Sequence, residues 1–169
     1  PFTSNANFNS DLFKDHINKA QRLMDDLIDL EIEKIDTILQ KIESDPEEES
    51  SKRTERDLWK RIKKMAEIGR RSGLGITGEG DMLAALGLIY GTDDAIDFSV
   101  KVQKILKLEA YRSSVNLAKE RGSFEIWDPK REEKNPFIQR IKEEDSALYT
   151  DMMIYGRRNV ALLTIAPTG

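Results

Sequence analysis

The stretch that decides the fold is the C-terminal end of the printed sequence, which reads RRNVALLTIAPTG over residues 157–169. Residues 160–166 form a near-continuous apolar run that is typical of a buried β-strand, and a Pro-Thr-Gly turn follows it. No second strand is predicted in the chain, so the backbone groups of this strand must pair outside these residues or with another copy. The strand is therefore predicted to be an orphan.

The remainder of the chain is predicted to be mainly α, beginning with a long amphipathic helix. Apolar residues recur at steps of three and four between Phe13 and Leu27, which places Met24 on the inner face. Ser10 is the predicted N-cap, so the helix should begin just after it. The apolar pattern continues past residue 40, but a change of phase at 30–32 indicates a kink or a break.

A charged segment and several shorter helices follow the first helix. The segment 44–57 contains Pro46 and no large apolar residue, so we expect a solvated connector. Gly122 and Gly156 each follow an amphipathic pattern and are the predicted helix stops. Helical spacing recurs over 58–66, 93–121, 136–143 and 146–155.

Six of the ten glycines lie between Gly69 and Gly87, in a stretch that permits two interpretations. Glycines before a helix can expose backbone amides to a phosphate. However, the stretch has neither a P-loop lysine nor a clean GxGxxG after an apolar strand, and Glu79 and Asp81 would repel an anion. Close packing of a buried turn and helix is therefore favoured, and a small phosphate-binding protein remains the alternative.

Composition argues against several classes of partner. The 27 Lys and Arg against 31 Asp and Glu give a net charge of −4, which does not predict a nucleic-acid surface. No run approaches the ~20 apolar residues of a membrane span, and the N-terminus lacks the pattern of a signal peptide. We expect a cytoplasmic protein without nucleic-acid or membrane partners.

No catalytic or metal site is predicted in this chain. It contains no cysteine, and His16 is its only histidine, so neither thiol chemistry nor a histidine metal site is expected. The carboxylates lie in mixed, solvated charge runs, and Ser72, Ser113 and Ser114 have no histidine in a recognisable arrangement.

Four motifs in one order resemble the catalytic (large) subunit of ribonucleotide reductase. They read LFKDHINKAQRLMDDLIDL, GRRSGLGITGEGDMLAALGLIYGTDDAIDF, EAYRSSVNLAKERGSFEIWD and GRRNVALLTIAPTG. The resemblance spans nearly the whole chain and rests most on RRSGLGITG, NLAKERGSF and RRNVALLTIAPTG. The connector EEESSKRTERD is longer and more charged than the family pattern.

The resemblance implies a fold and a site. It implies that residues 1–169 are a helical, partial segment of a ten-stranded α/β barrel, beginning after the finger loop that carries the radical cysteine. Residues 159–169 would then be a barrel strand followed by a truncated phosphate loop. By position, the substrate-phosphate contacts of the family fall on Pro167, Thr168 and Gly169, where a hydroxyl and a glycine suit an anion.

The resemblance also implies an activity, which the isolated chain is not expected to show. The intact enzyme reduces ribonucleotides to 2′-deoxyribonucleotides with a thiyl radical, and the wording LLTIAPTG is closer to the adenosylcobalamin-dependent class than to the class with a metal-radical partner subunit. No cofactor is expected in this chain. The expected partners are the rest of the catalytic subunit, the ribonucleotide and, through 160–166, a second copy. The alternatives are a non-catalytic helical interaction module and the small phosphate-binding protein.

Overall fold

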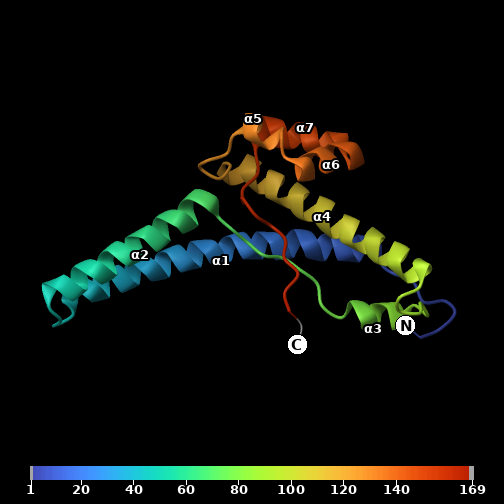
Figure 1. Cartoon of the computed structure of the whole chain (residues 1–169), viewed down its shortest axis with the longest axis horizontal. Coiled ribbons are helices and arrows are strands. Elements are labelled where there is room, and N and C mark those ends of the chain that lie inside the picture. Colours follow the sequence, from blue (N-terminus) through green and yellow to red (C-terminus); the bar gives the residue numbers. More distant parts are fainter. Residues whose placement is uncertain (1, 168–169) are drawn as a thin grey trace.

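The computed structural model describes residues 2–167, and helices dominate it (Figure 1). The two longest helices pack against each other, and the short helices near the C-terminal end of the chain pack against the second of them (Figure 1). In chain order the helices are α1 (Ser10–Ser44), α2 (Glu49–Gly69), α3 (Glu79–Ala85), α4 (Asp93–Arg121), α5 (Pro129–Glu132), α6 (Pro136–Glu144) and α7 (Ser146–Tyr155). The mainly α prediction is confirmed.

The first helix is continuous over 35 residues, so the break predicted at 30–32 does not occur. No glycine or proline interrupts α1, and α2 packs along its C-terminal half while α4 packs along its N-terminal half (Figure 1). The helix is capped one residue earlier than predicted, because Asn9 Oδ1 accepts a hydrogen bond of 3.0 Å from the Leu12 amide.

The predicted connector 44–57 is largely exposed, but most of it is helical. Only residues 45–48 separate α1 from α2, which begins at Glu49. Ion pairs hold the two helices together, since Arg56 bonds Glu43 at 2.6 Å and Lys63 bonds Asp36 at 2.6 Å. A polar sequence can thus form a helix when a neighbouring helix supplies its partners.

The inner face of α1 differs from the predicted apolar stripe. Ile17 is buried as expected, whereas Leu27 is 47% exposed and Met24 is only half-buried. Gln21 and Asp25 are fully buried instead. The inner face of α1 is rotated because these two polar residues bind the extended segments described below, and apolar periodicity cannot reveal such contacts.

The central helix α4 organises the core. It packs against α1 and α7, and Gly122 ends it as predicted. The helices α6 and α7 also agree closely with their predicted ranges, with Asn135 and Asp145 as N-caps and Gly156 after the last turn. The buried core consists of Ile17, Leu106, Ala110, Tyr111, Val115, Ile138, Ile141, Leu148, Met152 and Leu162.

The terminal apolar segment has a partner within the chain, so the prediction of an orphan strand was wrong. Residues 70–76 and 160–164 run parallel and share a bridge between Leu74 and Leu163. Leu74 N–H donates to Leu162 O at 2.7 Å, and Thr164 N–H donates to Leu74 O at 3.0 Å. Within residues 2–167 this pair forms a single bridge and no regular strand. The glycine-rich partner carries no strand signal of its own, which is why sequence reasoning missed it.

Candidate functional site

The glycines of residues 69–75 form the surface on which the terminal segment lies. A Cβ atom at Gly75 would lie 2.5 Å from Thr164 O, and one at Gly73 would lie 3.2 Å from Thr164 Cγ2. A Cβ atom at Gly69 would lie 3.3 Å from Val160 Cγ1. The close-packing interpretation of this glycine-rich stretch is therefore confirmed for its first half.

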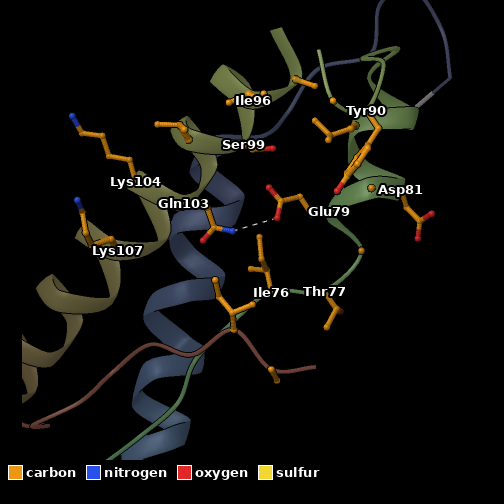
Figure 2. A pocket seen from close by; sticks show the side chains of 18 of the residues that line it. Ile76, Thr77, Glu79, Asp81, Tyr90, Ile96, Ser99, Gln103, Lys104 and Lys107 are labelled. Carbon is orange, nitrogen blue, oxygen red and sulfur yellow. Dashed lines mark hydrogen bonds between the residues drawn. The ribbon is translucent and has the colours of Figure 1, made fainter. Parts of the chain in front are cut away.

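The carboxyl ends of the two parallel segments lie at one cavity of about 1040 Å³, which we call the α3/α4 cavity (Figure 2). Residues 76–81 form one wall and α4 forms the opposite wall, while Ile165 and Ala166 of the terminal segment also line it. The glycine-rich stretch thus has a second role, because its latter half borders this cavity. Ligands commonly bind beyond the carboxyl ends of parallel strands, so this cavity is the candidate functional site.

Charged groups of both signs line the cavity. Glu79 projects from the start of α3 toward α4, where Gln103 Nε2 donates to it at 3.5 Å (Figure 2). Lys104 and Lys107 lie on the α4 wall, and Lys107 pairs with Glu144. Among residues 2–167, no carboxylate pairs with Lys104. Lys104 is thus the lysine of this lining that has no carboxylate partner among residues 2–167, and Ile76 adds apolar surface.

The structure reaches only the first of the three predicted phosphate-binding residues. Pro167 is exposed and follows Ala166, a residue that lines the cavity. Thr168 and Gly169 lie outside the described residues. The predicted turn thus begins at the cavity, and the phosphate contacts themselves stay a prediction.

Two clusters hold the start of the terminal segment. In the first, Arg157 is 3% exposed and bonds Glu132 at 2.8 and 3.2 Å. It also donates to Asn159 O at 3.1 Å and to Val160 O at 3.2 Å. Three rings surround its guanidinium at 5.2–5.7 Å, namely Tyr111, Phe124 and Trp127. Cation–π contacts and a bidentate carboxylate together compensate this buried charge.

The second cluster centres on Asp25 of α1, which is fully buried. Its carboxylate accepts from Arg70 Nε at 2.8 Å, Asn159 Nδ2 at 3.0 Å and Arg158 Nε at 3.3 Å. Arg121 also reaches it at 3.1 Å. Burial raises the pKa of Asp25, but the hydrogen bond from Arg70, the charges of Arg70 and Arg158 and the Asn159 amide outweigh it, and the net pKa lies below the usual value. We call Asp25, Arg70, Arg158 and Asn159 the Asp25 network.

Asn159 uses every hydrogen-bonding group of its side chain in this network. Its amide nitrogen also donates to Arg70 O at 3.0 Å. Its carbonyl oxygen accepts from Ser114 at 2.9 Å and from Gln21 at 3.2 Å. Gln21 Oε1 is buried without a partner among the described residues.

The sequence analysis did not predict the roles of Gln21, Asp25, Arg70 and Asn159. A usable signal was present, because the polar residues at 21 and 25 lie at helical spacing with the buried Ile17 and Ile28.

Neither the clustered aspartates nor the serines suggest a catalytic centre. Asp25, Asp26 and Asp29 lie close enough to share a metal ion, but arginines already bond all three carboxylates. The serine hydroxyls donate within the fold: Ser72 to Ala161 O, Ser113 to Asn18 O and Ser114 to Asn159. These aspartates form an ion-pair network.

The described helices include none that is both long and apolar enough to cross a membrane.

Comparison with known proteins identifies the family. The model of the family described as "Ribonucleotide reductase, barrel domain" matches residues 2–169. The vitamin B12-dependent ribonucleoside-diphosphate reductase of Thermoplasma acidophilum is 34% identical over 108 residues, which is 64% of this chain and 12% of that protein. The enzyme of the same name from Mycobacterium tuberculosis is 28% identical over 104 residues, or 62% of this chain and 12% of that protein.

A relative with a different name matches a similar share of the chain. The ribonucleoside-diphosphate reductase subunit alpha of Chlamydia pneumoniae is 30% identical over 125 residues, covering 62% of this chain and 12% of that protein. In each of these three relatives the matched region is 12% of the length. The family model covers nearly the whole chain, and the chain belongs to the ribonucleotide reductase barrel-domain family.

Proposed function

We propose that this chain is an internal part of a ribonucleotide reductase catalytic subunit and that residues 167–169 bind substrate phosphates. The intact enzyme would reduce ribonucleotides to 2′-deoxyribonucleotides by thiyl-radical chemistry in the cytoplasm. The observation that carries the proposal is the parallel pairing of 70–76 with 160–164, which brings Pro167 to the carboxyl end of the pair beside the α3/α4 cavity. This is the end at which parallel sheets bind ligands.

Each residue of the turn has a distinct part in this proposal. Pro167 fixes the backbone where the extended segment ends. Thr168 supplies a hydroxyl donor, and Gly169 lets the backbone amides approach the phosphate closely. Lys104 on the α4 wall adds a favourable potential for an anion, which opposes the unfavourable potential of Glu79 and Asp81 on the facing wall.

The proposed cofactor of the intact enzyme is adenosylcobalamin, which would generate the radical. Relatives named for vitamin B12 dependence support this class, and the relative named as a subunit alpha keeps a metal-radical partner subunit as the alternative. The residues of this chain do not fit a cobalamin or radical-metal site, since the chain has no cysteine and its single histidine, His16, is exposed on α1. The part of these residues is to bind and orient the substrate.

The proposed partner of the helical layer is the remainder of the same catalytic subunit. Leu23, Leu27 and Leu30 recur at helical spacing on α1 and are 59%, 47% and 58% exposed. A contiguous apolar row on a helix needs cover in a stable protein. Further chain of the barrel would supply it, and the row also supports the interaction role of the alternative helical module.

The test uses the intact reductase that contains these residues. Thr168→Val should raise the Kd for the nucleotide about tenfold, since it removes one hydrogen bond to a charged group. Thr164→Val, which removes a hydroxyl from the same segment ahead of the turn, is the matched control and should bind normally. Equal affinities for wild type and Thr168→Val would remove Thr168 from the phosphate site.

The isolated chain should form no deoxynucleotide with any thiol reductant or added adenosylcobalamin, because it lacks a thiol that could carry the radical. Product above the blank in that assay would contradict this expectation.

A further inference from the structure

The parallel pair that ends at the α3/α4 cavity has little in its own backbone to fix its register. It shares one bridge, and Gly73 and Gly75 supply no side chains that could distinguish one alignment from the next. Glycine-rich strands specify register weakly. A slip of one residue would move Pro167 by about 3.3 Å along the segment, farther than a hydrogen bond to a phosphate tolerates.

The Asp25 network contacts both segments at their amino-terminal ends. Arg70 begins one segment and Asn159 directly precedes the other, and Asp25 Oδ1 accepts from both side chains, at 2.8 and 3.0 Å. Asn159 Nδ2 also bonds Arg70 O directly at 3.0 Å. Residue 159 is thereby fixed beside residue 70 by side-chain bonds that a slipped alignment could not make.

The Arg157 cluster, at the same end of the pair, bonds only one of the two segments. Arg157 donates to the carbonyls of Asn159, which precedes the terminal segment, and of Val160, its first residue. None of its hydrogen bonds within the described residues reaches 70–76. It holds one segment to the helices α4 and α5. The two clusters therefore differ in function, since of these two clusters the Asp25 network alone joins the segments, where it adds to the bond from Ser72 to Ala161 O.

We propose that Asp25 is a positioning residue whose network sets the register of the parallel pair and, through it, the place of the phosphate turn. The last step rests on the proposed function of residues 167–169. Asp25 lies at the amino-terminal end of the pair and does not itself contact the proposed substrate. It acts over the length of the pair by holding the buried Arg70 and Asn159 side by side.

The first test measures amide hydrogen exchange in this chain. In Asp25→Asn, exchange at Leu74 and Thr164 should accelerate at least tenfold more than at Val115 in the α4 core, because the neutral side chain weakens the charge-assisted bonds that residue 25 accepts from arginines. Asp26→Asn removes a half-exposed carboxylate, paired with Arg121, from the same helix and should leave that ratio unchanged. Ile17→Ala, which destabilises the core without touching the network, should accelerate all three amides alike.

Two outcomes decide the register claim. A preferential loss of protection at Leu74 and Thr164 supports it, and a ratio in Asp25→Asn equal to that of Ile17→Ala overturns it. Should Asp25→Asn fail to fold, Asn159→Ala removes the amide that donates to Asp25 and to Arg70 O without placing a second charge beside Asp25, and the same ratio then decides.

The second test separates the register claim from the proposed function. In the intact reductase, Asp25→Asn should raise the KM for the nucleotide about tenfold with kcat per folded enzyme unchanged, whereas simple loss of folded protein lowers activity without changing KM. An unchanged KM together with altered exchange would leave the register claim standing and refute the placement of the phosphate turn.

Discussion

Replacing Gly75 with alanine should force the two extended segments apart. The added Cβ would lie 2.5 Å from Thr164 O, a backbone atom that cannot rotate away. An ordinary carbon–oxygen contact is about 3.3 Å, so the segments must separate by roughly 0.8 Å. That shift stretches the two hydrogen bonds that Leu74 makes with Leu162 and Thr164, now 2.7 and 3.0 Å.

The expected loss of stability follows from these two bonds. Each contributes about 1 kcal/mol, and alanine returns about 0.5 kcal/mol by restricting the unfolded chain. The net destabilisation is then about 1.5 kcal/mol, which lowers the Tm of a domain of this size by about 3–6 °C.

The assay is thermal unfolding, with amide exchange at Leu74 and Thr164 as a local readout. Gly73→Ala meets side-chain atoms of Thr164, Cγ2 at 3.2 Å and Cβ at 3.5 Å, and a small shift of the methyl group relieves the closer contact, so its Tm should stay close to wild type. Gly80→Ala meets no atom within 4 Å and lies in α3, so it should be neutral or stabilising by up to about 1 kcal/mol. A Gly75→Ala variant as stable as Gly80→Ala would refute the packing argument.

Two further predictions concern acid stability and association. Folding lowers the pKa of Asp25, so its contribution to stability is present above its unfolded value of about 3.9 and is lost as the pH falls through the folded value. Urea unfolding at pH 7 and pH 3 should therefore show a smaller acid loss in Asp25→Asn than in wild type, and equal losses would contradict the network. Self-association through 160–166 stays a prediction, and its test changes because Leu162 is only 1% exposed whereas Ile165 is 91% exposed. Light scattering should show Ile165→Lys to be more monomeric than wild type, with Ile154→Lys on α7 as control, and identical masses for the two variants would exclude this segment as the contact.

Most helix boundaries were predictable because their signals are local. Asp145 and Gly156 bracket α7 in sequence as they do in structure, and Gly122 ends α4. A helix cap or stop acts on residues a few positions away, so it can be predicted from the sequence. The start of α2 could not be predicted from the sequence, because the ion pairs of Arg56 and Lys63 that stabilise it are made with carboxylates on α1.

The family was also predictable from the chain, because a motif such as RRNVALLTIAPTG keeps its residues in a fixed order, whereas the phosphate contacts of residues 167–169 stay a prediction. The position of Pro167 beside a cavity was not readable, since it depends on a second segment some ninety residues earlier.

The sequence by itself determined a mainly helical chain, the ends of most helices and an apolar terminal segment, since periodicity and capping act over one or two turns. Only the tertiary structure decided that Gln21 and Asp25 face inward and that residues 70–76 pair with 160–164. The physical reason is that a buried carboxylate is stable only where distant donors converge on it. The donors to Asp25 come from Arg70, Arg158 and Asn159, which are far from it in the sequence. No local sequence pattern predicts these contacts.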